Sequence, residues 1–164
     1  MTAGSAGTFI LAAAVASIVA GPVVGRLADR IDCRRLMRNG LAGGAVSFAV
    51  LALPSPPLWL PVVAMVGLGV AEVFVVIPAF PVMVKAARLD LDEATASAFA
   101  STVFNAAWSA GEGLGPVLGV WPMYHWGFAA TMAACACCLV AAIPISTMLS
   151  TWTKHGRSAA VHDV

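Results

Sequence analysis

Two glutamates stand inside apolar stretches of this 164-residue chain: Glu72 in GLGVAEVFVV and Glu112 in SAGEGLGPVLG. A carboxylate at the centre of a membrane helix costs on the order of 2.5–3.5 kcal/mol, and desolvation favours its protonated form. In a lined cavity such a side chain can load and release a proton or hold a cationic amine. We therefore take both glutamates as candidate proton- or substrate-binding residues.

A polar stripe accompanies Glu112. Its members recur at spacings of three and four residues, which places them on one helix face: Ser101, Asn105, Trp108, Ser109 and Glu112. A polar face is penalised against lipid, so we expect it to line a pathway. The alternative is hydrogen bonding between helices without transport. Pathway lining is favoured for Glu72 and balanced against that alternative for Glu112. Trp108 offers a π face to a cation, but ordinary packing is favoured for it.

The composition places these residues in a membrane. Apolar residues make up 60% of the chain and charged residues 10%, and the mean hydropathy is +0.91. A soluble domain has roughly a quarter of its residues charged. A net charge of +1 argues against nucleic-acid binding. The four cysteines lack metal-ligand spacing, and no nucleophile–base set or phosphate-binding loop is present. We expect neither an enzyme, nor a metal, nor a cofactor.

The chain divides into apolar runs of the length that crosses a bilayer, about 20 residues each. The five runs are 8–25, 37–53, 58–84, 96–120 and 127–150. PSPP (54–57) separates the second run from the third, and WPMYHW (121–126) separates the fourth from the fifth. The sequence thus predicts an all-α membrane protein with about five transmembrane helices, forming one domain over residues 1–164.

The basic residues predict how these helices are oriented. They flank the first turn, the third turn and the tail, and they are Arg26, Arg30, Arg34, Arg35, Arg38, Lys85, Arg88, Lys154 and Arg157. Alternate crossings put all nine on one side, which should be cytoplasmic. The amino terminus is then outside or lumenal and the carboxy terminus cytoplasmic, in either a vesicle membrane or the plasma membrane. Trp59, Trp121, Tyr124 and Trp126 would lie at the outer interface, and Trp152 at the inner one.

The first turn, GRLADRIDCRR, places an acid among arginines. Its candidate functional residues are Gly25, Asp29, Arg30, Arg34 and Arg35. Ion pairs between Asp29 and these arginines would lock one conformation of the cytoplasmic face. Simple anchoring by positive charge is the alternative, and the order of residues favours a lock.

A second motif lies in the fourth run, where GEGLGPVLG spaces small residues four apart. Its residues are Gly111, Gly115, Pro116 and Gly119. This spacing lets two helix backbones approach closely in lipid, and Pro116 permits a bend. The motif therefore predicts a helix-packing surface, for which close packing without any further role is the simpler explanation.

The order G-x-x-x-D-R-x-x-x-R-R resembles the signature loop of the major facilitator superfamily of transporters. That family has a glycine where this chain has Asp32. The segment from IPAFP to LGPVLG resembles the second half of the vesicular amine and polyamine branch, through I-P-x-F-P, an acidic connection and W-S-x-G before L-G-P-x-L-G. The resemblance implies alternating access between two six-helix halves, with the loop as a conformational latch, and proton-coupled antiport of an organic cation. A drug-type proton antiporter is the nearest alternative.

By this resemblance the five runs correspond to the eighth to twelfth of about twelve helices, in the carboxy-terminal six-helix bundle. The chain is then the later part of a longer transporter or a truncated product. The implied partners are the lipid bilayer, a small-molecule substrate, and the missing amino-terminal half or a full-length relative. The alternative function is that of a truncated, non-transporting membrane protein that acts as an interaction or regulatory partner.

Overall fold

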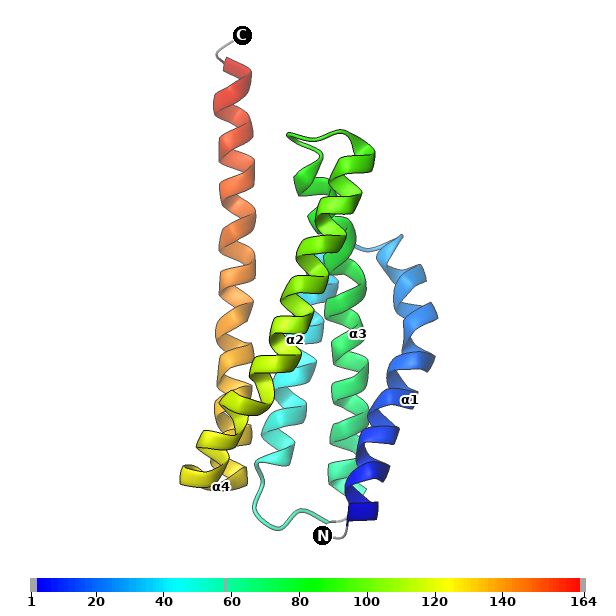
Figure 1. The fold of residues 1–164 in the computed structure, drawn as a ribbon, viewed down its shortest axis with the longest axis vertical. Helices are drawn as coiled ribbons and strands as arrows, with labels where there is room; N and C mark the ends of the chain where they lie inside the picture. The colour runs from blue at the N-terminus through cyan, green and yellow to red at the C-terminus, as the bar shows by residue number, and fades with distance from the viewer. Residues whose placement is uncertain (1–2, 58, 163–164) are drawn as a thin grey trace.

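The protein is all-helical in the part of the chain that its structure, a computed structural model, describes: the backbone of residues 3–57 and 59–162, and the side chains of residues 7–57 and 59–144. Its helices, in chain order, are α1 (Ala3–Ala28), α2 (Cys33–Leu51), α3 (Trp59–Ala87) and α4 (Glu93–His162) (Figure 1). This confirms the predicted all-α class. Each of the five predicted apolar runs overlaps a helical segment, although the bounds of the runs and of the helices differ.

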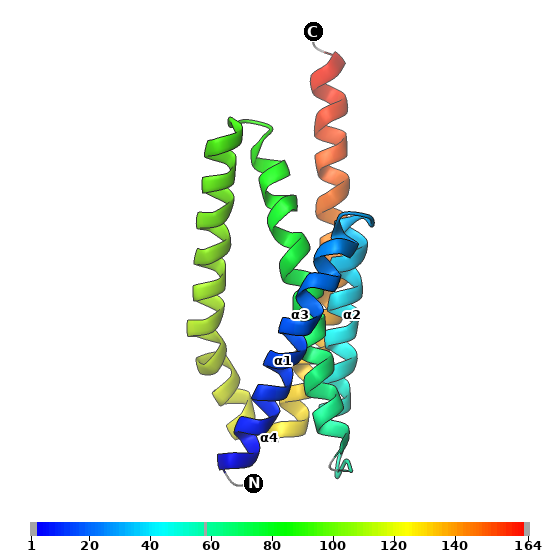
Figure 2. The ribbon, with the colours of Figure 1, turned by 90° about the vertical axis from the view of Figure 1, so that its right-hand side faces the viewer.

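A sharp bend at Gly127 divides α4 into two arms. Gly127 has φ 81° and ψ 172°, a backbone conformation that only glycine adopts without strain. The first arm (93–126) and the second arm (128–162) run in opposite directions (Figure 1), and Figure 2 shows them standing apart except near the bend. The sequence predicted that WPMYHW would separate two helices. The structure instead keeps these residues helical and turns at the next one, where Trp121 contacts the rings of His125 and Trp126.

Aspartates begin two of the helices. Asp32 caps α2, because its Oδ1 accepts a hydrogen bond of 3.1 Å from the backbone N–H of Arg34. Asp92 precedes α4, and its Oδ2 accepts from the N–H of Thr95 at 3.2 Å. The α1–α2 and α3–α4 turns lie toward the same end of the molecule, opposite the α2–α3 turn and the bend in α4 (Figure 1). The arginines of the first turn, Lys85 and Arg88 therefore share one end.

Helix α3 is central, since it packs against α1, α2 and α4. Small residues make this possible. A methyl group built at Gly40 of α2 would lie 2.8 Å from the carbonyl oxygen of Ala71, and one at Gly67 would lie 2.6 Å from the hydroxyl of Ser47. At Gly44 it would lie 3.1 Å from Leu139 of the second arm. The backbones thus approach closely only because these positions lack side chains.

The outward surface of the helices is apolar, as lipid solvation requires. The buried core of Val24, Leu36 and Val73 is small, while Ile18, Val19 and Val23 of α1 are more than half exposed. Among the described residues, three segments are long and apolar enough to cross a membrane: Gly7–Ala28, Trp59–Ala87 and Glu93–Pro144. The last contains the whole first arm of α4 and the second arm as far as Pro144, and α2 carries three arginines near its start. The chain has the helices of a multi-pass membrane protein, without five spans being established.

Candidate functional site

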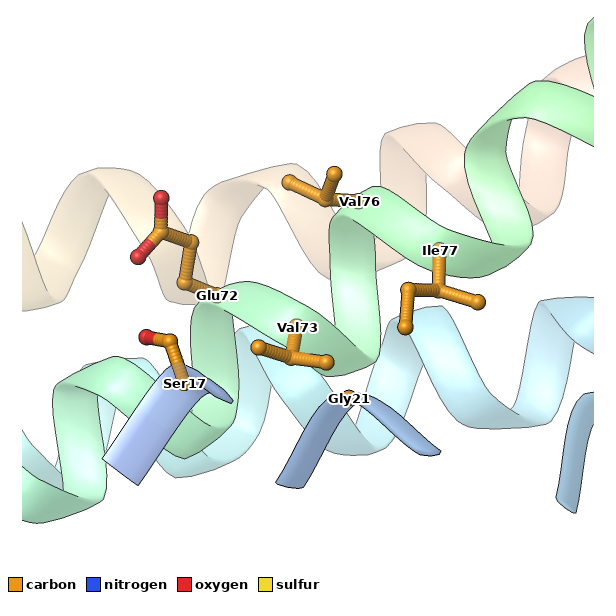
Figure 3. Close-up of a pocket in the computed structure, with 6 residues that line it drawn as sticks. All are labelled: Ser17, Gly21, Glu72, Val73, Val76 and Ile77. Carbon is orange, nitrogen blue, oxygen red and sulfur yellow. The ribbon is translucent and has the colours of Figure 1, made fainter. Parts of the chain in front are cut away.

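Glu72 is exposed, and its side chain lines a cavity between α1 and α3. The cavity has a volume of about 220 Å³ and is lined by Ser17, Gly21, Glu72, Val73, Val76 and Ile77. Figure 3 shows the Glu72 carboxylate and the Ser17 hydroxyl extending from α3 and α1 on the same side of the cavity. The remaining side chains are apolar. Glu72 is the one ionisable group of this lining, so a proton or a cation entering the cavity would meet its carboxylate.

Ser17 is a site residue that the sequence reasoning missed. Its Oγ donates to the carbonyl oxygen of Ala13 in its own helix at 3.1 Å and to that of Gly69 in α3 at 2.9 Å. The signal was present: Ala13, Ser17 and Gly21 stand four residues apart, and such small-residue spacing marks a helix-packing face in membranes. What the spacing did not reveal is that this face meets α3 beside Glu72.

The polar stripe of α4 lies on an open surface. Asn105, Ser109 and Glu112 are exposed, and Trp108 is 40% exposed with its ring stacked on Phe104. The cavity at Glu72 includes none of these residues. The structure therefore brings Glu72 together with Ser17 but does not join it to the Glu112 stripe in one lining.

The glycine–proline motif of the first arm has no neighbour in the described part of the chain. A methyl group built at Gly111, Gly115 or Gly119 would meet nothing within 4 Å. Residues 105–118 are all exposed, whereas Ala96 and Ala100 near the start of the arm are buried. Pro116 lacks the N–H that would bond the carbonyl of Glu112, four residues earlier. This turn thus presents a backbone acceptor in addition to the Glu112 carboxylate.

The arginine-rich turn is solvent-facing. Asp29, Arg30, Arg34 and Arg35 are exposed, and Gly25 is half-buried with open space around it. Among the described side chains, the ion pair that forms is Arg88–Glu93 at the α3–α4 turn, so Asp29 forms none there. Asp32 stands where the resembling family has glycine, and it caps α2. Lys154, Arg157 and Trp152 lie outside the described side chains.

A second cavity, of about 610 Å³, lies where the C-terminal end of α3 meets the start of α4. Phe80, Pro81 and Val84 line one part of it, and Lys85, Arg88 and Glu93 line another. Next to it, hydrogen bonds from the side chain and then the backbone N–H of Thr95 hold the pKa of Asp92 below its usual range. These contacts order the start of α4.

Comparisons with known proteins agree with this architecture. Residues 1–161 match the family described as the Major Facilitator Superfamily. A protein of Streptomyces coelicolor named "probable transporter" is 32% identical over 140 residues, which is 85% of this chain and 31% of that protein. The match thus spans about a third of the length of this relative. No solved structure matches. Neither match distinguishes the vesicular amine and polyamine branch from others.

Proposed function

The chain belongs to the major facilitator superfamily, and on that premise we propose that it contributes to proton-coupled antiport of a small organic cation. Members of a transporter family move a solute across the membrane, which accounts for the multi-pass apolar helices. In our proposal the solute is an amine or related cation, and the transported proton binds at Glu72. Alternating access, in which repeats rock around a fixed site, is the corresponding motion.

The observation that carries this proposal is the position of Glu72. It lies within α3, which is long and apolar enough to cross a membrane, and its exposed side chain lines a cavity whose other members are apolar apart from Ser17. Ionisable groups inside membrane helices are costly and commonly mark ion or substrate pathways.

The stripe on α4 is our candidate for a second part of the pathway. Asn105, Ser109 and Glu112 lie on one exposed face, and Pro116 frees the backbone carbonyl of Glu112. Carboxylate, amide and carbonyl oxygens together suit an ammonium group, and Trp108 could cover it. In this arrangement the Gly111, Gly115 and Gly119 face would approach a helix from elsewhere in a longer protein or from a full-length relative. The exposed Asp29–Arg30 turn would serve as the latch against such a partner.

The second candidate function is that of a non-transporting membrane protein which binds a full-length relative. It is favoured by the same open face of the first arm, where residues 105–118 are all exposed. A small-residue face of this kind in lipid is stabilised by a second helix. This role requires the arm but not Glu72, so the two candidates differ in which residue matters.

Reconstitution tests the proposal. The chain would be placed in liposomes preloaded with radiolabelled tetraethylammonium or spermidine, and an outward or inward pH gradient would be imposed. We expect cation exchange that depends on the gradient and is abolished by Glu72→Gln, which keeps the shape of the side chain but cannot ionise. Ser47→Ala is the matched control, since Ser47 is buried between α2 and α3 outside the cavity.

Each result separates the candidates. Gradient-driven exchange that survives Glu72→Gln would remove Glu72 from the mechanism. Correctly inserted chain that exchanges neither cation would argue against transport of these cations by the chain itself. Co-purification of that chain with a full-length relative, lost when Gly115 is changed to Leu, would then support the interaction role.

A further inference from the structure

Ser17 joins α1 to α3 at a point where the two backbones nearly touch. A methyl group built at Gly69 would overlap the carbonyl oxygen of Ala13 and lie 3.0 Å from the Ser17 hydroxyl. The Ser17 hydroxyl bonds the carbonyls of both Ala13 and Gly69. It is therefore held within the closest-packed part of the α1–α3 contact rather than at its edge.

The hydroxyl of Ser17 has one hydrogen and two acceptor lone pairs. Its hydrogen is already shared between the two carbonyl oxygens, at 3.1 and 2.9 Å. Toward the cavity, Ser17 can therefore accept a hydrogen bond but has no further hydrogen to donate. A group that enters beside it must bring a donor of its own.

Glu72 is the neighbour to which this restriction applies. It stands three residues after Gly69 on α3, and it shares the cavity lining with Ser17 (Figure 3). A protonated Glu72 carries an O–H that Ser17 can accept. An ionised Glu72 carries acceptors only, so it can bond Ser17 only by taking the hydrogen that now goes to Gly69. That exchange would break the hydrogen bond between α1 and α3.

We propose that Ser17 is the hydrogen-bond acceptor for protonated Glu72 and couples the charge of Glu72 to the α1–α3 contact. The inference rests on the proposed proton-binding role of Glu72. Ser17 acts through Glu72, so it is a positioning residue. When Glu72 binds a proton from water, the Ser17–Gly69 bond is kept and a second bond is added. When the proton returns to water, the carboxylate competes for the Ser17 hydrogen and loosens α1 from α3.

The other groups that face the cavity do not interfere with this exchange. Gly21, Val73, Val76 and Ile77 complete its lining and none of them titrates. In the described part of α1, ionisable side chains begin at Arg26, more than two helical turns beyond Ser17. The charge in this part of the α1–α3 contact is therefore set by Glu72.

Infrared difference spectroscopy tests the proposal on the full chain in lipid nanodiscs. The carbonyl stretch of protonated Glu72 is identified as the acid-minus-alkaline band that disappears in Glu72→Gln. In Ser17→Ala we expect this band at a higher wavenumber, because its hydrogen-bond acceptor is gone. Ser17→Thr retains the hydroxyl and should restore the original position. Ser47→Ala, which removes a buried hydroxyl on the other side of α3, should leave the band unchanged.

The outcomes distinguish this inference from the proposal on which it rests. A Glu72 band that titrates but does not move in Ser17→Ala overturns the role of Ser17 and leaves the proton-binding role of Glu72 standing. A spectrum in which Glu72→Gln removes no band overturns both. Ser17→Cys keeps the size of the side chain with a poor acceptor, and it replaces Ser17→Ala if the smaller residue destabilises the α1–α3 contact.

Discussion

Two regions of this molecule contain small residues at helical spacing, and they differ in what surrounds those residues. In the α1–α2–α3 group, methyl groups built at Gly40, Gly67 and Gly69 would collide with a neighbouring helix. In the first arm of α4, methyl groups at Gly111, Gly115 and Gly119 would meet nothing within 4 Å. The first region is a completed helix interface, whereas the second is a face with room for a partner.

The difference teaches that a glycine motif marks the capacity for close packing and not the packing itself. The motif GEGLGPVLG is more regular than the scattered glycines of α2 and α3, yet the scattered ones form the contacts. In lipid, a small-residue face gains stability only from the helix that reaches it. The partner is supplied by tertiary structure, so the local pattern does not say which faces are occupied.

The largest expected effect is the difference in stability between a glycine-to-alanine change in the α1–α2–α3 group and the same change in the first arm of α4. Gly69→Ala places a methyl group on the Ala13 carbonyl, and we expect the free energy of unfolding to fall by about 1–3 kcal/mol. Gly115→Ala adds a methyl group in open space and should be neutral or stabilise the helix, by roughly 0.5–1 kcal/mol at most. Circular dichroism during unfolding by sodium dodecyl sulfate in mixed micelles measures both.

A destabilising Gly115→Ala would break the comparison, because it would show that the arm is packed in the isolated chain. If alanine were tolerated equally well at Gly69 and Gly115, the comparison would also fail. That result would show that α1 and α3 do not approach as closely as Gly69 indicates. Gly43→Ala is a useful intermediate, as its methyl group would reach ordinary contact with Ala71 at 3.7 Å.

A smaller effect is expected where α2 begins. Asp32→Ala removes the side chain that accepts from the N–H of Arg34, and we expect a loss of about 0.5–2 kcal/mol in the free energy of unfolding. Asp32→Gly introduces the residue that the resembling family loop has at this position. It should lower the free energy of unfolding by only about a few tenths of a kcal/mol. The same detergent titration measures both. Equal losses for alanine and glycine would show that the side-chain cap is not what stabilises the first turn.

The smallest effect is expected at the start of the first arm and depends on pH. The pKa of Asp92 is lowered in the folded chain, first by the Thr95 side chain. The stabilisation is therefore fully present above the ordinary aspartate pKa and is lost as the pH falls through the lowered value. Hydrogen exchange at the amide of residue 95 should accelerate in that range. Thr95→Val removes the hydroxyl, so acceleration should begin at a higher pH; an unchanged onset would contradict the assignment.

Much of the fold follows from sequence because its causes are local. Apolar runs of membrane length predicted the helices, and the charge pattern predicted that the first and third turns share an end. The bend before the last helix lies one residue beyond the predicted separator: residues 121–126 are helical, and Gly127 provides the backbone conformation for the turn. Glu72 was identified because a charged group among apolar residues has a high free-energy cost in a membrane. Ser17 was not identified, because a single serine in a membrane helix is common and has a low cost.

The sequence by itself determined that this is a membrane protein, where its helices lie and which turns carry the basic residues. It also identified the two glutamates whose position among apolar residues suggests a function. Each of these depends on composition or on spacing along one helix. Only the tertiary structure decided that Glu72 and Ser17 line one cavity between α1 and α3, that Gly69 lets the two helices approach there, and that the α4 stripe lies apart from this cavity. Residues 17, 69 and 72 come together because two helices cross there, and a crossing point depends on side-chain packing between segments distant in the chain.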